Sequence, residues 1–171
     1  MLIARITRRS GERAAMREME AELTEGELAA WGERIGREAR TPLVMALRGD
    51  LGAGKSTLAR AVARGAGVEG EVPSPTFNLL FRYDTPGGTQ VQHLDLYRLE
   101  HPDEVWELGW AELPGARDLV LIEWPQRAEH LLPEPRWEVE LEEAGDPDRR
   151  RVTARPVGAP PPLPAPDGRA P

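Results

Sequence analysis

The stretch "GDLGAGKST", Gly49 to Thr57, decides the fold class of this chain. It matches G-x-x-x-x-G-K-[ST], the phosphate-binding loop, and it stands between an apolar strand-like run (43–47) and a helix-like segment (55–67). Lys55 is the only lysine, whereas the other 21 of the 22 basic side chains are arginine. A compact ammonium fits a narrow loop that a planar guanidinium would displace. The lone lysine therefore favours a phosphate site over a chance glycine-rich turn.

Each residue type in this loop has a chemical reason. Glycines let successive backbone N–H groups point into one concavity, and the following helix presents its positive N-terminal end to phosphate. Lys55 places its charge on the β and γ phosphates of a nucleotide, and the Ser56 hydroxyl is a ligand for Mg²⁺. The residues expected to contact the nucleotide here are Gly49, Leu51, Gly52, Ala53, Gly54, Lys55, Ser56 and Thr57.

The base of the nucleotide is constrained by a missing motif. Switch GTPases read guanine with Asn-Lys-x-Asp, which needs a second lysine, and the single asparagine, Asn78, is followed by leucine. The sequence therefore predicts ATP, with Mg²⁺, as the bound nucleotide.

Two carboxylates are candidates for the other side of a magnesium–nucleotide site. Glu123 ends the apolar run "LVLI", where an unpartnered charge is costly, and Asp95 lies in "VQHLDLY". We expect one to bind the metal or its water and the other to position a water, although an ordinary strand-end acid or a cap is the alternative. Thr76 in "SPTF" is either a γ-phosphate sensor or a turn hydroxyl. Trp124 lies either beside the nucleotide or in the core.

Composition excludes several classes of function. The chain has no cysteine, so disulfides and zinc–thiolate sites are excluded. Its net charge of -7 disfavours a broad grip on DNA or RNA, because phosphate neutralisation needs a basic face. The run Arg149–Arg151 is interpreted as a solvated strand start. Without a visible secretory signal, and with apolar runs too short to cross a membrane, we expect a cytoplasmic protein without membrane contact.

The remaining pattern predicts alternating helices and strands. Residues 1–9 are a possible edge strand and residues 10–23 permit a helix. A capping box, Thr24 with Glu27, opens a helix that ends before Pro42. Further expected elements are a hairpin (76–83 with 89–97), a helix (101–113), a buried strand (118–124) and a second hairpin (136–143 with 149–157).

Some side chains left alternatives open. Trp106, Trp110 and Leu113 recur at helical spacing, and core packing is favoured over a docking face for a partner. His93, His101 and His130 are isolated. His93, two residues before Asp95, either lines the site or packs in the ordinary way, and ordinary packing is favoured.

Four motifs in order, "GDLGAGKST", "SPTF", "HLDLYRL" with "HPDEVWELG", and "IEWPQR" with "LLPEP", resemble the TsaE (YjeE) family over about residues 24–155. These are P-loop ATPases of bacterial tRNA threonylcarbamoyladenosine biosynthesis. The resemblance implies an α/β, P-loop NTPase-like three-layer sandwich with a central, mostly parallel sheet plus antiparallel hairpin strands. It also implies docking on TsaD- and TsaB-type proteins, with tRNA contacted only through that complex.

The resemblance also implies roles for individual residues. Lys55 and Ser56 correspond to the phosphate and magnesium residues, Glu123 to the second magnesium residue, Asp95 to a residue needed for hydrolysis, Thr76 to the switch threonine and Trp124 to the tryptophan of "EWP". Two positions depart from the family pattern: Ser56 replaces the common threonine, and Leu28 stands near a usual threonine. A family arginine near the last hairpin corresponds to Arg149, Arg150 or Arg151.

We therefore expect an N-terminal extension (1–23), a P-loop ATPase domain (24–155) and a proline-rich disordered tail (156–171). The expected activity is ATP hydrolysis, weak in isolation and dependent on partners, that supports repeated turnover of the tRNA-modifying complex. The alternatives are a small-molecule P-loop kinase and a nucleotide-gated binding module without a hydrolytic role.

Overall fold

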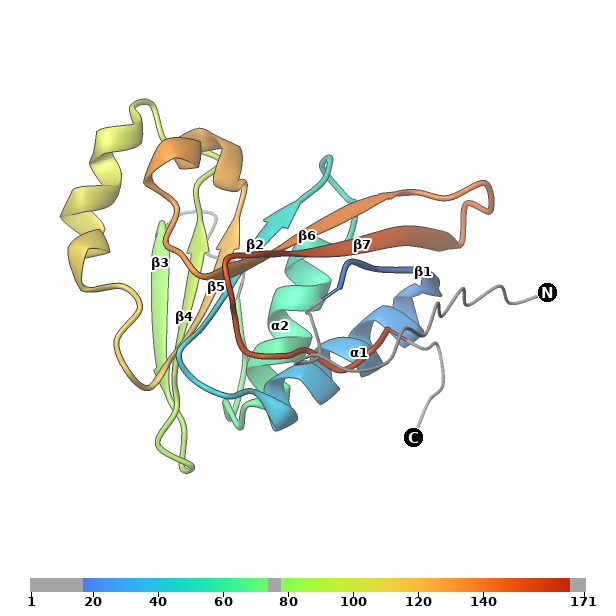
Figure 1. Cartoon of the computed structure of the whole chain (residues 1–171), viewed down its shortest axis with the longest axis horizontal. Coiled ribbons are helices and arrows are strands. Elements are labelled where there is room, and N and C mark those ends of the chain that lie inside the picture. Colours follow the sequence, from blue (N-terminus) through green and yellow to red (C-terminus); the bar gives the residue numbers. More distant parts are fainter. Residues whose placement is uncertain (1–16, 74–77, 167–171) are drawn as a thin grey trace.

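The computed structural model describes residues 17–73 and 78–166. The strands of these residues are β1 (Met19–Thr24), β2 (Leu43–Arg48), β3 (Leu80–Asp84), β4 (Gln90–Asp95), β5 (Asp118–Glu123), β6 (Arg136–Glu143) and β7 (Arg149–Val157). They form one seven-stranded sheet in the order β1-β7-β6-β2-β5-β4-β3 (Figure 1). The centre, β6-β2-β5-β4, is parallel, and both flanks are antiparallel. The expected α/β class, with a parallel core and antiparallel hairpins, is confirmed.

Helices cover both faces of this sheet. Helices α1 (Glu25–Glu38) and α2 (Lys55–Gly65) pack on one face, and the short 3-10 helices η1 (Pro102–Leu108), η2 (Trp110–Glu112) and η3 (Pro125–Leu131) pack on the other (Figure 1). Strand β2 shows why: Leu43, Met45 and Leu47 join the core under α1 and α2, whereas Val44 and Ala46 join the core on the opposite side. Both faces of the central strands are apolar because both are covered.

The helix expected over 101–113 is present as η1 and η2. Gly109 adopts the left-handed conformation (φ 80°) between them, so one continuous α-helix does not form. The two tryptophans of this segment have different surroundings. Trp110 is buried and its indole N–H donates to the Leu131 carbonyl oxygen at 2.6 Å, whereas Trp106 is 50% exposed.

Helix α1 begins as its capping box predicts. The backbone N–H of Glu27 donates to Thr24 Oγ1 at 3.3 Å, and the backbone N–H of Thr24 donates to Glu27 Oε2 at 2.8 Å. The backbone bond from Thr24 is the largest cause that lowers the pKa of Glu27. Two orphan donors at the helix start are thereby satisfied.

The N-terminal segment corrects one expectation. Residues 19–24 form strand β1, antiparallel to β7, and not part of a helix. Alternation explains this: Met19, Ala21 and Leu23 pack on the core while the glutamates between them face outward. Period-two packing against β7 outweighs the helix propensity of these residues. The strand suggested for residues 1–9 lies outside the described residues.

The proline-rich tail also differs from expectation over residues 158–166. This segment passes across α1 (Figure 1) and is hydrogen-bonded there, whereas the sequence predicted disorder. The Trp31 indole N–H donates to Pro164 O, and that of Trp137 to Pro161 O, both at 2.8 Å. Leu163 packs against the same core. Proline has no N–H to satisfy and offers ring carbons and a carbonyl, so this segment can cover two buried indoles that each need an acceptor.

We predict that deleting residues 158–171 lowers the free energy of unfolding, and that Trp31→Phe lowers it by about 1 kcal/mol more in the full chain than in the truncated one. The difference isolates the hydrogen bond to Pro164, because the loss of indole volume occurs in both backgrounds. Urea denaturation of the four proteins measures it. Equal costs in the two backgrounds would show that the bond contributes nothing.

Candidate functional site

The phosphate-binding loop lies between the end of β2 and the start of α2. Gly49, Gly52 and Gly54 all have positive φ (138°, 80° and 106°), which folds the loop back over the helix start. Gly54 is the N-cap of α2 and supplies no side-chain hydrogen bond, so the first-turn N–H groups of α2 lie at the loop. This is the arrangement that binds an anion at a helix N-terminus.

Gly49 is the tightest point of the loop. A methyl group there would collide with the backbone oxygen of Leu141 on β6, and the φ of 138° is unfavourable for other residues. At Gly52, by contrast, a methyl group would meet open space, although its φ is also positive.

Lys55 turns back into the loop from the first position of α2. Its Nζ donates to the carbonyl oxygens of Gly49 (2.6 Å) and Asp50 (2.7 Å), and it lies 4.1 Å from the centre of the Trp124 ring. Burial lowers the pKa of Lys55, and the charges of Glu123, Asp95 and Asp50 oppose that shift. The cation is thus held at the mouth of the loop, among oxygens and an aromatic face.

The two predicted carboxylates meet at one edge of the sheet. Asp95 and Glu123 are the last residues of the parallel strands β4 and β5, and they are register partners. The Ser56 hydroxyl donates to Glu123 Oε2 at 2.8 Å, which links β5 to α2. Asp95 Oδ1 accepts the backbone N–H of Tyr97 at 3.0 Å. Burial is the main cause that raises the pKa of Asp95, and the Glu123 charge adds to it.

His93 lies in the site, whereas the sequence analysis favoured ordinary packing for it. Its Nε2 lies 2.7 Å from Glu123 Oε1, and the ring is fully buried. The signal was present in "HLD": alternation puts His93 and Asp95 on the same face of one strand, two residues apart.

Trp124 lies at the site and not only in the core. Among the described residues other than glycine, it alone has positive φ (57°), which is unusual for a bulky side chain. Its ring packs 4.8 Å from that of Tyr97 and covers Lys55. Arg127 in turn lies 5.8 Å from the Tyr97 ring centre. The strained residue therefore aims an aromatic surface at the loop lysine.

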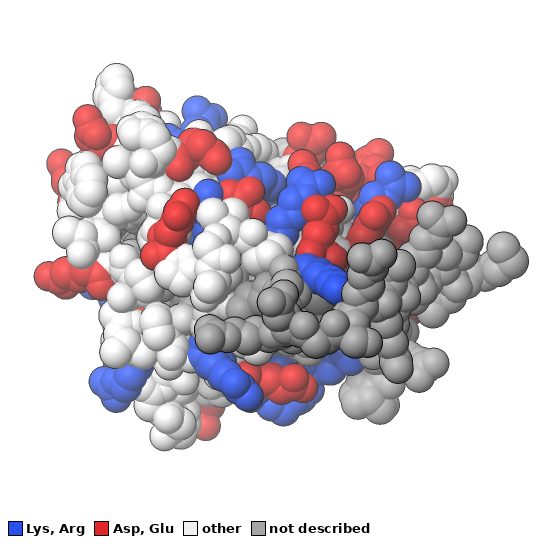
Figure 2. Space-filling view, in the orientation of Figure 1, with Lys and Arg blue, Asp and Glu red and all other residues white. Residues whose placement is uncertain are grey.

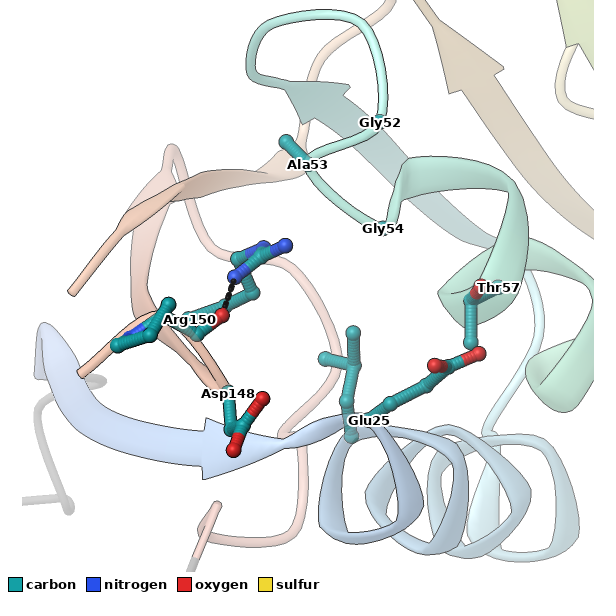
Figure 3. Close-up of a pocket in the computed structure, with 9 residues that line it drawn as sticks. Glu25, Gly52, Ala53, Gly54, Thr57, Asp148 and Arg150 are labelled. Carbon is teal, nitrogen blue, oxygen red and sulfur yellow. Dashed lines mark hydrogen bonds between the residues drawn. The ribbon is translucent and has the colours of Figure 1, made fainter.

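A cavity of about 350 Å³ adjoins the loop on the α1 side. Figure 3 shows the side chains of Glu25 and Thr57 close together on one side of it, with Asp148 and Arg150 on the other side. Leu28 also lines it. The lining residues are Glu25, Leu28, Gly52, Ala53, Gly54, Thr57, Pro147, Asp148 and Arg150.

The three consecutive arginines of β7 have different surroundings. Arg149 pairs with Glu27 at 3.3 Å and Arg151 with Glu22 at 3.1 Å, whereas Arg150 lines the cavity and donates to the Pro147 oxygen. Of the three, Arg150 is therefore the one at the cavity.

On the face shown in Figure 2, acidic and basic side chains are interspersed, and the described residues form no continuous basic area there.

Three other predicted site residues remain. Leu51 is 83% exposed at the loop tip. Thr57 lies in the first turn of α2 and lines the cavity. Thr76, with the rest of "SPTF", lies outside the described residues.

The residues at the sheet edge fit a magnesium ion held jointly with a nucleotide. No group of three or more His, Asp or Glu side chains among residues 17–73 and 78–166 forms a metal site by itself. Ser56 Oγ and Glu123 Oε2, 2.8 Å apart beside the phosphate loop, are oxygen ligands of the type Mg²⁺ prefers, and Mg²⁺ commonly keeps water and phosphate oxygens for the rest of its shell.

A family model matches residues 23–152: "Threonylcarbamoyl adenosine biosynthesis protein TsaE". The chain belongs to the TsaE family. A TsaE relative from Rickettsia bellii is 44% identical over 108 residues, covering 63% of this chain and 73% of the relative. Another from Bacillus subtilis is 39% identical over 115 residues, covering 67% and 70%. Both are named tRNA threonylcarbamoyladenosine biosynthesis protein TsaE.

The fold of this TsaE-family chain is also found in a solved structure. The crystal structure of Bacillus subtilis YdiB superposes with a TM-score of 0.66 at 28% sequence identity, covering 85% of this chain and 90% of that one. The predicted family is thereby confirmed. In the described part of this TsaE-family chain, no helix has the length and apolar character needed to cross a membrane.

We predict that Gly49→Ala lowers the free energy of unfolding by about 3 kcal/mol, whereas Gly52→Ala lowers it by about 1 kcal/mol. Both variants strain a positive-φ position, but only the first collides with the backbone of β6. Urea denaturation measures the two costs, and Gly52→Ala serves as the matched control. Equal losses of stability in the two variants would show that the backbone of β6 does not exclude a side chain at position 49.

Proposed function

We propose that this TsaE-family chain binds and hydrolyses Mg²⁺–ATP in the biosynthesis of threonylcarbamoyladenosine in tRNA. The observation that carries the proposal is the contact of Ser56 with Glu123 at the foot of a loop that holds Lys55. The Ser56 side chain lies in the first turn of α2 and the Glu123 side chain ends a parallel strand, so phosphate and metal ligands converge from two elements. Family membership supports the pathway.

Different residues of the site are proposed to bind the nucleotide and to promote its hydrolysis. Backbone N–H groups of the loop and the start of α2 bind phosphate oxygens, and Lys55 supplies the cation. Ser56 and Glu123 would hold Mg²⁺, which neutralises charge on the phosphates when bound. Asp95, beside Glu123, orients the attacking water. Trp124 excludes bulk water from the Lys55 ammonium, which strengthens its attraction for phosphate.

The cavity beside the loop is proposed to receive the nucleoside part of ATP. Gly52 and Gly54 of the loop line one side of it, and α1 and the turn between β6 and β7 line the others. Arg150 is held there by Pro147 O at 2.9 Å.

The proposed partners are the TsaD- and TsaB-type proteins, with tRNA contacted through them, in the cytoplasm. The net charge of -7 supports indirect contact, because a protein that grips nucleic acid itself needs a continuous basic face. The chain acts in this proposal as the nucleotide-driven subunit that supports repeated turnover.

The decisive experiment counts modified tRNA per complex in a purified reaction with TsaD- and TsaB-type proteins and ATP. Wild type should give many turnovers, while Lys55→Ala and Glu123→Gln should give no more than the reaction without this chain. Asp118→Asn is the matched control, because Asp118 is also a buried acid but begins β5 and bonds Gln92. If Glu123→Gln performs like wild type while Lys55→Ala fails, ATP binding alone is the signal. If the chain has no effect, phosphate transfer from ATP to small metabolites is tested next.

We predict that Lys55→Arg weakens ATP binding by at least about tenfold, although the charge is retained. The loop encloses Nζ between two carbonyl oxygens and the Trp124 ring, and a planar guanidinium is too wide for that space. Titration with a fluorescent ATP analogue measures the affinity. An affinity like that of wild type would show that charge alone suffices.

We predict that Arg150→Ala weakens nucleotide binding about two- to fivefold, whereas Arg151→Ala leaves it unchanged. Arg151 pairs with Glu20 and Glu22 on β1 and does not line the cavity. The same fluorescence titration distinguishes the two. A larger loss for Arg151→Ala would place the nucleoside elsewhere.

A further inference from the structure

His93 makes a contact that the proposed hydrolysis does not use. The ring lies on β4 with no exposed surface, and its Nε2 is 2.7 Å from Glu123 Oε1. Its other nitrogen, Nδ1, is buried and has no hydrogen-bond partner among the described residues. A buried imidazole with one strong partner and one empty nitrogen is unusual, since buried polar atoms are generally paired.

The hydrogen-bond pattern assigns the tautomer. Glu123 accepts the Ser56 hydroxyl at Oε2, so the carboxylate oxygen Oε1 is the remaining acceptor that faces His93. Nε2 therefore carries the hydrogen, and Nδ1 is left with a lone pair. A buried lone pair without a donor is tolerated more readily than a buried N–H without an acceptor.

The register explains how the ring reaches this carboxylate. His93 is opposite Leu121 on β5, and Asp95 is opposite Glu123. His93 thus extends diagonally along the sheet to a residue two positions further on β5. A continuous line of hydrogen bonds runs from β4 through Glu123 to α2.

We propose that His93 is a positioning residue for Glu123: its Nε2–H holds Oε1 so that Oε2 is presented beside Ser56, toward the metal. This rests on the proposed function. The terminal torsion of a glutamate is broad, so one hydrogen bond leaves the carboxylate free to rotate and a second one fixes it. Mutation of a group that hydrogen-bonds a metal-binding side chain typically weakens metal affinity by about 10–100-fold.

Three substitutions separate positioning from packing. His93→Leu retains bulk and removes the donor. The amide nitrogen of His93→Gln can occupy the place of Nε2, whereas His93→Asn is polar but one methylene too short. Gln92→Met is the matched control, because Gln92 is a buried polar residue of the same strand whose amide donates to Asp118 and not to Glu123.

The full chain is titrated with Mn²⁺ in the presence of saturating ADP, and free Mn²⁺ is measured by its paramagnetic resonance signal. We expect the Mn²⁺ dissociation constant to rise about 10–100-fold in His93→Leu and His93→Asn, and to stay within about threefold of wild type in His93→Gln and Gln92→Met. ADP affinity measured in EDTA should change less than about twofold in all four variants, because no metal is then bound.

Three results would overturn the proposal: wild-type Mn²⁺ affinity in His93→Asn, equal weakening in His93→Gln and His93→Asn, or a parallel loss of ADP affinity in EDTA. If His93→Leu and His93→Asn fail to fold in thermal melts, the folded His93→Gln variant decides, with retained Mn²⁺ affinity as support and lost affinity as refutation. A wild-type chain that binds neither ADP nor Mn²⁺ refutes the proposed function itself, whereas normal wild-type binding with an unaltered His93→Asn refutes only this inference.

Discussion

Two opposite charges, on Lys55 and Glu123, are buried at the carboxyl edge of the sheet, and the rest of the architecture accommodates them. Removing such charges from water costs more than their attraction returns unless each is also hydrogen-bonded. Lys55 obtains two carbonyl oxygens from its own loop, and Glu123 obtains a hydroxyl from α2 and an imidazole from β4. These partners are in reach only because β2, β5 and β4 are parallel neighbours whose ends meet at one edge. The parallel direction of β5 is essential to this arrangement, since an antiparallel β5 would carry Glu123 to the opposite edge.

The features that could be predicted from the sequence are those whose cause lies within a few residues. The phosphate loop, the Thr24–Glu27 box and the two hairpins each combine a turn or cap signal with an apolar period, and all are present in the structure. The sequence also singled out Glu123, because a charge that ends an apolar strand needs a nearby partner, and the structure places the other candidate carboxylate, Asp95, opposite it. Local consistency of this kind is common in sequences that specify one fold.

The missed features depend on partners far away in the chain. Strand β1 exists because β7 offers an edge about 130 positions later, and the ordered tail exists because Trp31 needs an acceptor 133 positions away. Neither partner is visible in the segment itself, where glutamate and alanine favour a helix and proline favours disorder. Ordinary packing was favoured for His93 for a related reason: its neighbour two residues away is apparent from alternation, but Glu123 becomes its partner only through the register of β4 with β5.

Helix α1 connects these long-range contacts to the site, but its start and its middle are held by different means. In the middle of the helix, Trp31 and Arg34 donate to carbonyl oxygens of the tail. Its first turn, which lines the cavity beside the phosphate loop, is held by the capping box and by the ion pair of Glu27 with Arg149. The site end of α1 is therefore anchored within the region that the family model matches, which ends at residue 152. The tail stabilises the middle of α1, and none of its described residues (158–166) lines the cavity.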